Sequence, residues 1–362
     1  MKEVSANTME CDVLVIGGGP AGLWAARKAA HAGLNAVVLE EHLAIGLQKH
    51  CSGWILGCEF TRSFFHELRD VIPHQTVSRM VIRDPLSGDI IEDIEDTGWG
   101  GYLVRREFFD RELANLAVRS GAKLFLHTRA ESFFKEDGRV VGVQTSSPSL
   151  PVIKARVTIC ADGMQSATRR GFARENVGSS DEVETYPGIQ MELAGVDNVT
   201  PGEIEINEGS DANLYGRSLW PHVNRITLAS FSSIEAYKYL RSRGDNLFSR
   251  KIAPSFPIYI SSFQNRKKMG FYYPRITQDG VMYIGEACGG SGVVHGMISA
   301  HYAARVVIES LHGGSISPES IEEYEEVMKR SDIYNTPFCY RHIRARYGSY
   351  RNWLERSGNI KV

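Results

Sequence analysis

The chain has 362 residues, of which 43% are hydrophobic and 23% charged, with a formal net charge of −2 at pH 7. This length allows two domains, or one large domain carrying an insertion. The small net charge excludes a global basic surface for nucleic acid, and the six cysteines have no metal-like spacing. The N terminus lacks the apolar core of a signal peptide, and no apolar run is long enough to span a bilayer, so we expect a cytoplasmic location.

The most informative segment is 11–22, which reads Cys-Asp-Val-Leu-Val-Ile-Gly-Gly-Gly-Pro-Ala-Gly. Its apolar part predicts a short buried strand, and the glycine-rich turn after it predicts a dinucleotide-binding β-α-β unit. Gly17 permits a sharp turn, Gly19 lets a pyrophosphate approach the backbone, and Gly22 lets the next helix pack against the strand. The N terminus of that helix offers N–H groups and a partial positive charge to phosphates.

A second strand is predicted over 35–39, and it ends in Glu40. A carboxylate at this position accepts hydrogen bonds from the ribose hydroxyls of an adenosine. An ordinary glycine-rich turn does not explain Glu40, so the pair of strands and the acid together predict a dinucleotide site. The adjacent Glu41 is a second acidic candidate at the same place.

The next 120 residues mix loops, strands and one helix. Residues 43–60 form a turn-rich loop with many Gly, Cys and His residues. The alternation over 76–95 predicts a hairpin, and the spacing over 104–120 predicts an amphipathic helix. Further strands are predicted over 123–145, and 157–163 reads as a buried strand that ends in Asp-Gly.

The later part of the chain begins with a long β-rich region. Residues 183–280 are strand-like and poor in helix signals, which predicts a separate sheet. An apolar strand over 281–285 then runs into a glycine-rich turn, and a helix is predicted over 293–310. The tail, 320–362, is rich in Tyr and Arg.

This order predicts an α/β fold with a Rossmann-like cofactor domain, made of a parallel sheet with helices. A mostly antiparallel β domain, the substrate domain, is inserted into it. The predicted boundaries are 1–75, 101–180 and 270–315 for the cofactor domain, 76–100 and 181–269 for the substrate domain, and 316–362 for a C-terminal helical tail.

Four motifs occur in an order that resembles flavoproteins of the p-hydroxybenzoate hydroxylase fold. After the glycine fingerprint come Arg106-x-x-x-Asp110 at a helix start, Asp162-Gly163 after a strand, and Gly285-Glu286. The resemblance implies bound FAD. It also implies that Arg106 reaches the cofactor, for which a planar guanidinium is suited. Arg105 is the alternative at this place.

The resemblance places Asp162-Gly163 near the pyrophosphate, whereas a tight turn needing only Asp-Gly is the alternative. Glu286 stands where the family has Asp and can accept from ribityl hydroxyls. The helix beginning near Gly292 would direct its positive end at an anionic reduced flavin. The candidate cofactor-binding residues are Gly17, Gly19, Pro20, Ala21, Gly22, Glu40, Glu41, Arg106, Ala161, Asp162, Gly163, Gly285, Glu286, Gly290, Gly292 and Val293.

Within this fold the chain most resembles the geranylgeranyl reductase family. The loop Ile45-Gly46 with 49–53, Lys-His-Cys-Ser-Gly, and the late Gly-Glu-Ala-Cys-Gly-Gly run of 285–290 carry the resemblance. It implies that reduced FAD delivers a hydride to a carbon–carbon double bond of a prenylated, apolar substrate while an acid delivers a proton. The implied electron donor is NAD(P)H or a reduced ferredoxin, the latter being a partner protein.

Cys51 and His50 are the catalytic candidates, because they lie in the loop that the resemblance places near the flavin. Cys51 is equally a candidate redox thiol or gate, and whether it pairs with Cys58 or Cys288 depends on distances. Tyr215 and Trp220 are the substrate candidates. The family has an aromatic motif on a strand of its substrate domain, roughly Pro-x-x-Tyr-x-Trp-x-Phe-Pro. When this chain is aligned with that motif, Trp220 takes the position of its last aromatic residue, and Tyr215 lies one residue away from the position of its tyrosine.

Two other functions stay open. One is a flavin-dependent aromatic monooxygenase of the same fold, and the other is a flavin-binding subunit that passes electrons to a partner. Residues 340–356 mix five arginines with aromatic side chains. They are a candidate for peripheral contact with anionic lipid headgroups, and a solvated helix packed on the body is the alternative.

Overall fold

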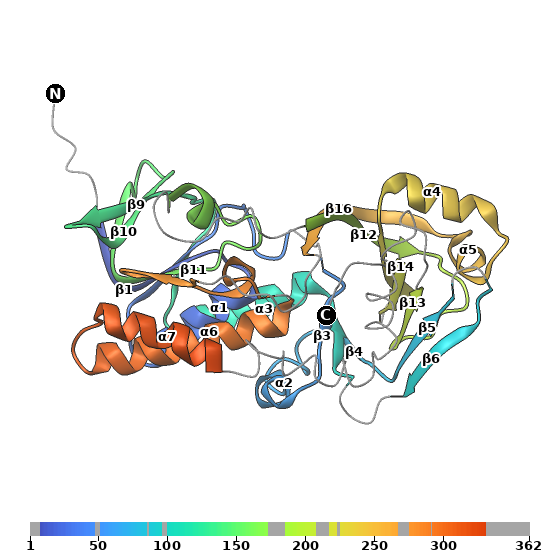
Figure 1. Cartoon of the computed structure of the whole chain (residues 1–362), viewed down its shortest axis with the longest axis horizontal. Coiled ribbons are helices and arrows are strands. Elements are labelled where there is room, and N and C mark those ends of the chain that lie inside the picture. The colour runs from blue at the N-terminus through green and yellow to red at the C-terminus, as the bar shows by residue number, and fades with distance from the viewer. Residues whose placement is uncertain are drawn as a thin grey trace. The chain divides into compact units, whose positions relative to one another are not determined.

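A computed structural model describes residues 8–47, 51–84, 87–95, 100–172, 185–207, 217–222, 225–266, 275–290 and 292–330. The chain divides into two compact units, which are described separately below (Figure 1). Unit 1 comprises Met1–Leu47, Phe109–Val183 and Lys268–Pro337, and unit 2 comprises Gln48–Phe108, Glu184–Lys267 and Phe338–Val362.

Unit 1 contains a parallel sheet and most of the helices. Its strands are β1 (Thr8–Ile16), β2 (Ala36–Leu39), β8 (Lys123–Phe125), β9 (Ala130–Glu136), β10 (Arg139–Thr145), β11 (Val152–Cys160), β17 (Thr277–Gln278) and β18 (Val281–Tyr283). Its helices are α1 (Pro20–His31), α3 (Arg106–Arg119) from Phe109 onward, the π-helical turn η1 (Thr168–Phe172), the 3-10 turn η5 (Gly285–Cys288), α6 (Val293–His312) and α7 (Pro318–Arg330).

The sheet of unit 1 has the order β17-β18-β11-β1-β2-β8, and β1 is parallel to both of its neighbours. The last four residues of β1, Val13–Ile16, are all buried because a central parallel strand has no solvent-facing side. Helices α1 and α6 pack against each other, and the β9–β10 hairpin lies across the sheet from them (Figure 1). The predicted parallel sheet with helices is confirmed.

Unit 2 contains two sheets and three short helices. Its strands are β3 (Trp54–Ile55), β4 (His74–Thr76), β5 (Arg79–Arg83), β6 (Ile90–Glu95), β7 (Tyr102–Val104), β12 (Thr185–Ala194), β13 (Glu203–Asn207), β14 (Arg217–Pro221), β15 (Ile226–Phe231) and β16 (Phe256–Arg266). Its helices are α2 (Glu59–Phe65), α4 (Ile234–Arg243) and α5 (Leu247–Ile252).

The larger sheet of unit 2 has the order β16-β12-β15-β14-β13-β5-β6, and the smaller has the order β3-β7-β4. In both sheets of unit 2 the described strand pairs are antiparallel, except that β13 and β5 of the larger sheet are parallel. The hairpin predicted over 76–95 is therefore confirmed as β5–β6, and the mostly antiparallel character of this unit is confirmed as well.

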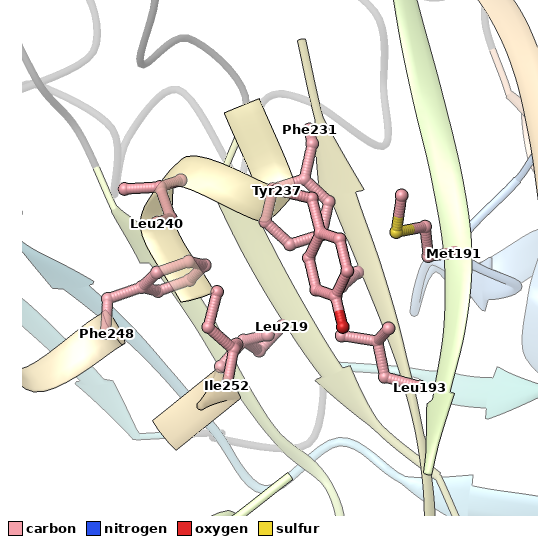
Figure 2. Packing of buried hydrophobic residues seen from close by; sticks show 9 residues of the cluster. Met191, Leu193, Leu219, Phe231, Tyr237, Leu240, Phe248 and Ile252 are labelled. Atoms are coloured by element: carbon pink, nitrogen blue, oxygen red, sulfur yellow. The ribbon is translucent and has the colours of Figure 1, made fainter. Parts of the chain in front are cut away.

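Helices α4 and α5 cover one face of the larger sheet (Figure 2). The rings of Tyr237 and Phe248 meet Phe231 edge-on, with centroid separations of 5.2 and 6.2 Å. Burying each such side chain contributes about 1.5–3 kcal/mol. The cluster is Met191, Leu193, Leu219, Ala229, Phe231, Tyr237, Leu240, Phe248 and Ile252.

The expectation that 183–280 is poor in helix was wrong for α4 and α5. The signals are present: the Ser233 and Asn246 side chains accept hydrogen bonds from the first turns, and Gly244 ends α4 in the left-handed conformation. Both helices are short, so their periodicity is weak beside the surrounding strands.

The unit boundaries differ from the predicted domain boundaries. Residues 48–75 and 101–108 belong to unit 2, because β3, β7 and β4 pair into one sheet there. Helix α7 belongs to unit 1, where it contacts α6 and β17. The rest of the predicted tail, including 340–356, lies outside the described residues. In the part of the chain that is described, no helix is both long and apolar enough to cross a membrane.

Candidate functional site

The glycine turn between β1 and α1 is held by contacts that only glycine permits. Gly17 has φ of +108°, and a Cβ there would lie 2.4 Å from the Ala161 carbonyl oxygen. A Cβ on Gly22 would lie 2.0 Å from the Gly17 oxygen. Gly19, in contrast, faces open space, with no atom within 4 Å of its Cβ position. The backbone is thus tightly packed at Gly17 and Gly22 and open at Gly19, where a diphosphate would lie.

Helices α1 and α6 both begin at a glycine, Gly19 and Gly292, without a side-chain cap and without an acidic residue in the first turn. Their first turns lie together, because a Cβ on Gly296 would be 3.4 Å from the Ala21 Cβ. Each N terminus carries a partial positive charge. Two of them side by side suit an anionic group, and this is the best structural evidence that unit 1 fits a dinucleotide cofactor.

Glu40 is fixed at the end of β2 by backbone donors. Its Oε2 accepts from the Gly18 N–H at 2.8 Å, and its Oε1 accepts from the His42 N–H at 2.9 Å. The His42 Nδ1 lies 2.5 Å from Oε1. A carboxylate has about four acceptor positions, so these contacts orient Glu40 and leave room for one more donor such as a ribose hydroxyl. Glu41 is exposed.

Asp162 is engaged within its own turn. Its carboxylate accepts from the Ser166 hydroxyl at 2.8 Å, from the Thr168 N–H at 2.9 Å and from the Thr168 hydroxyl at 3.0 Å. The side chain therefore stabilises the turn into η1, as the tight-turn alternative expects, while the Gly163 Cβ position faces open space. The Ala161 N–H donates to the Ile16 oxygen at 2.8 Å, which leaves the Gly163 backbone as the part of this motif open to a cofactor.

Arg169 ties the Asp162 turn to the second glycine-rich turn. It is 3% exposed, its Nε donates to the Ala287 oxygen at 2.9 Å, and its Nη1 donates to the Arg275 oxygen at 3.1 Å. Its guanidinium also lies 4.3 Å from the Tyr283 ring centroid. The sequence reasoning missed this role, and the Arg169-Arg170 pair after Asp-Gly was its only signal.

The Gly285 turn is held against α6. The Gly285 N–H donates to the Ser299 hydroxyl at 2.9 Å, which in turn donates to the Gly296 oxygen at 2.8 Å. Glu286 is half-buried, whereas Gly290 and Val293 are buried. The Cys288 thiol donates to the Gly285 oxygen at 3.0 Å, so this cysteine stabilises the turn.

Of the predicted catalytic and substrate residues, Cys51 and Trp220 are described, and both belong to unit 2. Cys51 is half-buried, and its sulfur accepts from the Gly53 N–H at 3.4 Å. Trp220 packs on Trp54 with ring centroids 5.5 Å apart. His50 and Tyr215 lie outside the described residues. All five described cysteines are free, so Cys51 pairs with neither Cys58 nor Cys288 in this structure.

Arg105 and Arg106 also belong to unit 2. Arg105 is buried and forms ion pairs with Glu107 and with Glu192, the latter at 3.0 Å. Both ion pairs are made by Nη2 of Arg105, and Arg106 is half-buried at the start of α3.

Comparisons with known proteins agree on one family. The model of the FAD dependent oxidoreductase family matches residues 12–250. Digeranylgeranylglycerophospholipid reductase from Thermoplasma acidophilum is 27% identical over 335 residues, covering 88% of this chain and 83% of that protein. The reductase of the same name from Methanoculleus marisnigri is 27% identical, covering 89% and 82%.

Solved structures share the fold. A geranylgeranyl bacteriochlorophyll reductase-like protein from Thermoplasma acidophilum superposes with a TM-score of 0.78 at 20% identity, covering 97% of this chain and 100% of that one. A p-nitrophenol 4-monooxygenase from Pseudomonas putida gives a TM-score of 0.71 at 16% identity, covering 97% and 92%. At these identities the likeness is one of architecture, which several chemistries use.

Proposed function

Because the chain belongs to the FAD-dependent oxidoreductase family, we propose that it uses FAD to reduce carbon–carbon double bonds of a prenylated, apolar substrate. The observation that carries this proposal is the extent of the similarity to the prenyl-lipid reductases. It covers 88% of this chain and 83% of the relative from Thermoplasma acidophilum, so it includes residues of both units rather than the glycine fingerprint alone.

The FAD would be held by residues of unit 1. The amides at the start of α1, from Pro20 onward, and the open position at Gly19 are proposed for the diphosphate. Glu40 is proposed for the adenosine ribose, for which its orientation by Gly18 and His42 is suited. The remaining assignments are Ala161, Asp162 and Gly163 for the diphosphate side, and Gly285, Glu286, Gly290, Gly292 and Val293 for the ribityl and flavin side.

FAD, when bound and reduced, supplies a hydride. An isolated double bond resists hydride attack, so a proton must reach the other carbon during the same step. We assign this proton to the Cys51 thiol: the S–H bond breaks as the new C–H bond forms, and the thiolate regains a proton from water. The paired rings of Trp54 and Trp220 are proposed to contact the apolar chain.

The start of α6 has a second role in this proposal. Its N terminus carries no acidic side chain in the first turn, so its partial charge is not neutralised. A negative charge that develops on the cofactor during reduction would be stabilised there. The electron donor is proposed to be NAD(P)H or a reduced ferredoxin, and comparing the two as reductants of the purified protein decides between them.

The test is product formation under anaerobic conditions. The FAD-loaded enzyme is reduced and incubated with a digeranylgeranyl glycerophospholipid, and the lipid is analysed by mass spectrometry. The proposal predicts a mass gain of two hydrogens for each double bond reduced. A lipid with fully saturated chains is the control. An unchanged lipid in the presence of reduced, FAD-loaded enzyme contradicts the proposal.

A further inference from the structure

The turn that carries Cys51 has little freedom to move. The Gly53 oxygen accepts from the Val104 N–H at 2.9 Å, and a Cβ on Gly53 would lie 2.0 Å from the Val104 oxygen. The next residue, Trp54, donates through Nε1 to the Gly100 oxygen at 2.6 Å. The turn is therefore fixed on its C-terminal side by β7 and the segment before it.

His222 holds the same turn from another strand. It follows β14 directly, is 1% exposed, and its Nε2 lies 3.1 Å from the Ser52 carbonyl oxygen. A carbonyl only accepts, so Nε2 must carry the hydrogen and donate it. Its Nδ1 has no hydrogen-bond partner among the described residues. The ring thus holds the turn through Nε2 alone.

The ring of His222 is neutral near pH 7. Burial, together with the nearby positive charge of Arg105, lowers the pKa of His222 to about 4, although the hydrogen bond to Ser52 and the Glu107 carboxylate both act to raise it. A neutral ring carries one N–H, and the Ser52 carbonyl determines that it is on Nε2. The tautomer of His222 is therefore set by its contact with the turn.

One peptide group connects His222 to the cysteine. The Ser52 carbonyl and the Gly53 N–H belong to the same planar peptide unit. His222 donates to the oxygen of this unit, and the nitrogen of this unit donates to the Cys51 sulfur at 3.4 Å. Fixing one end of a rigid plane fixes the direction of the other end, and consecutive hydrogen bonds polarise one another.

From this geometry we propose that His222 is a positioning residue, which orients the Ser52–Gly53 peptide so that its N–H points at the Cys51 sulfur. The importance of Cys51 for the reaction rests on the proposed function, whereas the effect of His222 on the thiol does not. A donated N–H stabilises the negative sulfur that reacts with electrophiles.

The test measures the alkylation rate of Cys51 by iodoacetamide in the FAD-loaded protein, followed by peptide mass spectrometry. In His222→Gln the amide nitrogen reaches about as far as Nε2, so we expect a rate within twofold of wild type. In His222→Asn the side chain is too short to reach Ser52, and the rate should fall about fivefold, the effect of losing one hydrogen bond. His74→Gln, which alters another His–carbonyl contact of unit 2, is the control.

Rescue by glutamine but not by asparagine separates positioning from a loss of packing, since both substitutions replace a ring by an amide. Equal rates in the two variants, or a faster rate in His222→Asn, would overturn the proposal. Anaerobic reoxidation of the reduced enzyme by prenylated lipid is then measured on the same proteins. Failure of the wild type in that assay, with the alkylation pattern intact, refutes the proposed function and leaves the role of His222 standing.

Discussion

Replacing Gly19 by alanine should weaken FAD binding without weakening the fold, and replacing Gly22 by alanine should weaken both. Gly19 has φ of −78° and ψ of 175°, which alanine adopts freely, and its Cβ position is open. Gly→Ala at such a position reduces the entropy of the unfolded chain and adds about 0.4–1 kcal/mol of stability. The apoprotein of Gly19→Ala should therefore be as stable as wild type, or slightly more so.

The same methyl group would stand where the diphosphate approaches the backbone. Losing one charge-assisted hydrogen bond costs about 1.5–3 kcal/mol, which is roughly a 10- to 150-fold increase in the Kd for FAD. In Gly22→Ala the new Cβ lies 2.0 Å from the Gly17 oxygen, a backbone atom that cannot move aside alone. Overpacking of this kind costs about 1–3 kcal/mol of apoprotein stability.

Urea unfolding of the apoproteins and titration with FAD, followed by flavin fluorescence, measure the two effects separately. Gly313→Ala is a suitable control, because this glycine lies at the other end of the 20-residue helix α6 and has φ of −73°. An apoprotein of Gly19→Ala that is destabilised by more than about 1 kcal/mol, or that binds FAD as tightly as wild type, would refute the reasoning about this turn.

Three further predictions concern unit 2. In single-turnover assays Cys51→Ser should slow lipid reduction by about 10²- to 10⁴-fold, which is the usual contribution of a general acid. Cys58→Ser is the control and should not slow it, because Cys58 is a buried N-cap of α2, a position where serine caps equally well. The pKa of His222 is lowered to about 4 in the folded protein, whereas a histidine in the unfolded chain has a pKa of about 6.5. As the pH falls below about 6.5, His222 is therefore protonated in the unfolded state before it is protonated in the folded state, which favours unfolding. Wild type should accordingly lose about 2 kcal/mol between pH 7 and pH 5 in urea unfolding, more than His222→Gln does. Phe231→Ala, at the centre of the α4–α5 cluster, should cost about 3–5 kcal/mol in the same assay, and a cost below 1 kcal/mol would contradict the packing in Figure 2.

Much of unit 1 is predictable because its signals are local. Gly17, Gly22 and Glu40 lie within 24 residues, and each residue type follows from a steric or hydrogen-bonding need of the turn itself. The strand over 281–285 and the helix over 293–310 were predicted to within two residues of the observed β18 and α6 for the same reason. The resemblance to prenyl reductases, based on 40–60 and 270–305, is confirmed by relatives that match along most of the chain.

The contacts that were not predictable join residues far apart in sequence. His222 and Ser52 are 170 positions apart, and Arg169 and Ala287 are 118 apart. No periodicity reports such a pair, because each partner reads as an ordinary loop residue in its own segment. The same limit applies to 48–75, which we predicted in the cofactor domain and which the structure groups with unit 2. The sheet that holds this segment forms only when β7, more than 40 residues after β3 begins, pairs with β3.

The most direct test of the central claim is the reoxidation of the reduced flavin in the absence of oxygen. Purified protein loaded with FAD is reduced, a prenylated glycerophospholipid is added, and the visible spectrum is recorded. The yellow oxidised flavin should return with the lipid and not with its saturated counterpart. Return of the colour only on admission of oxygen, or a protein that does not bind FAD at all, would contradict it.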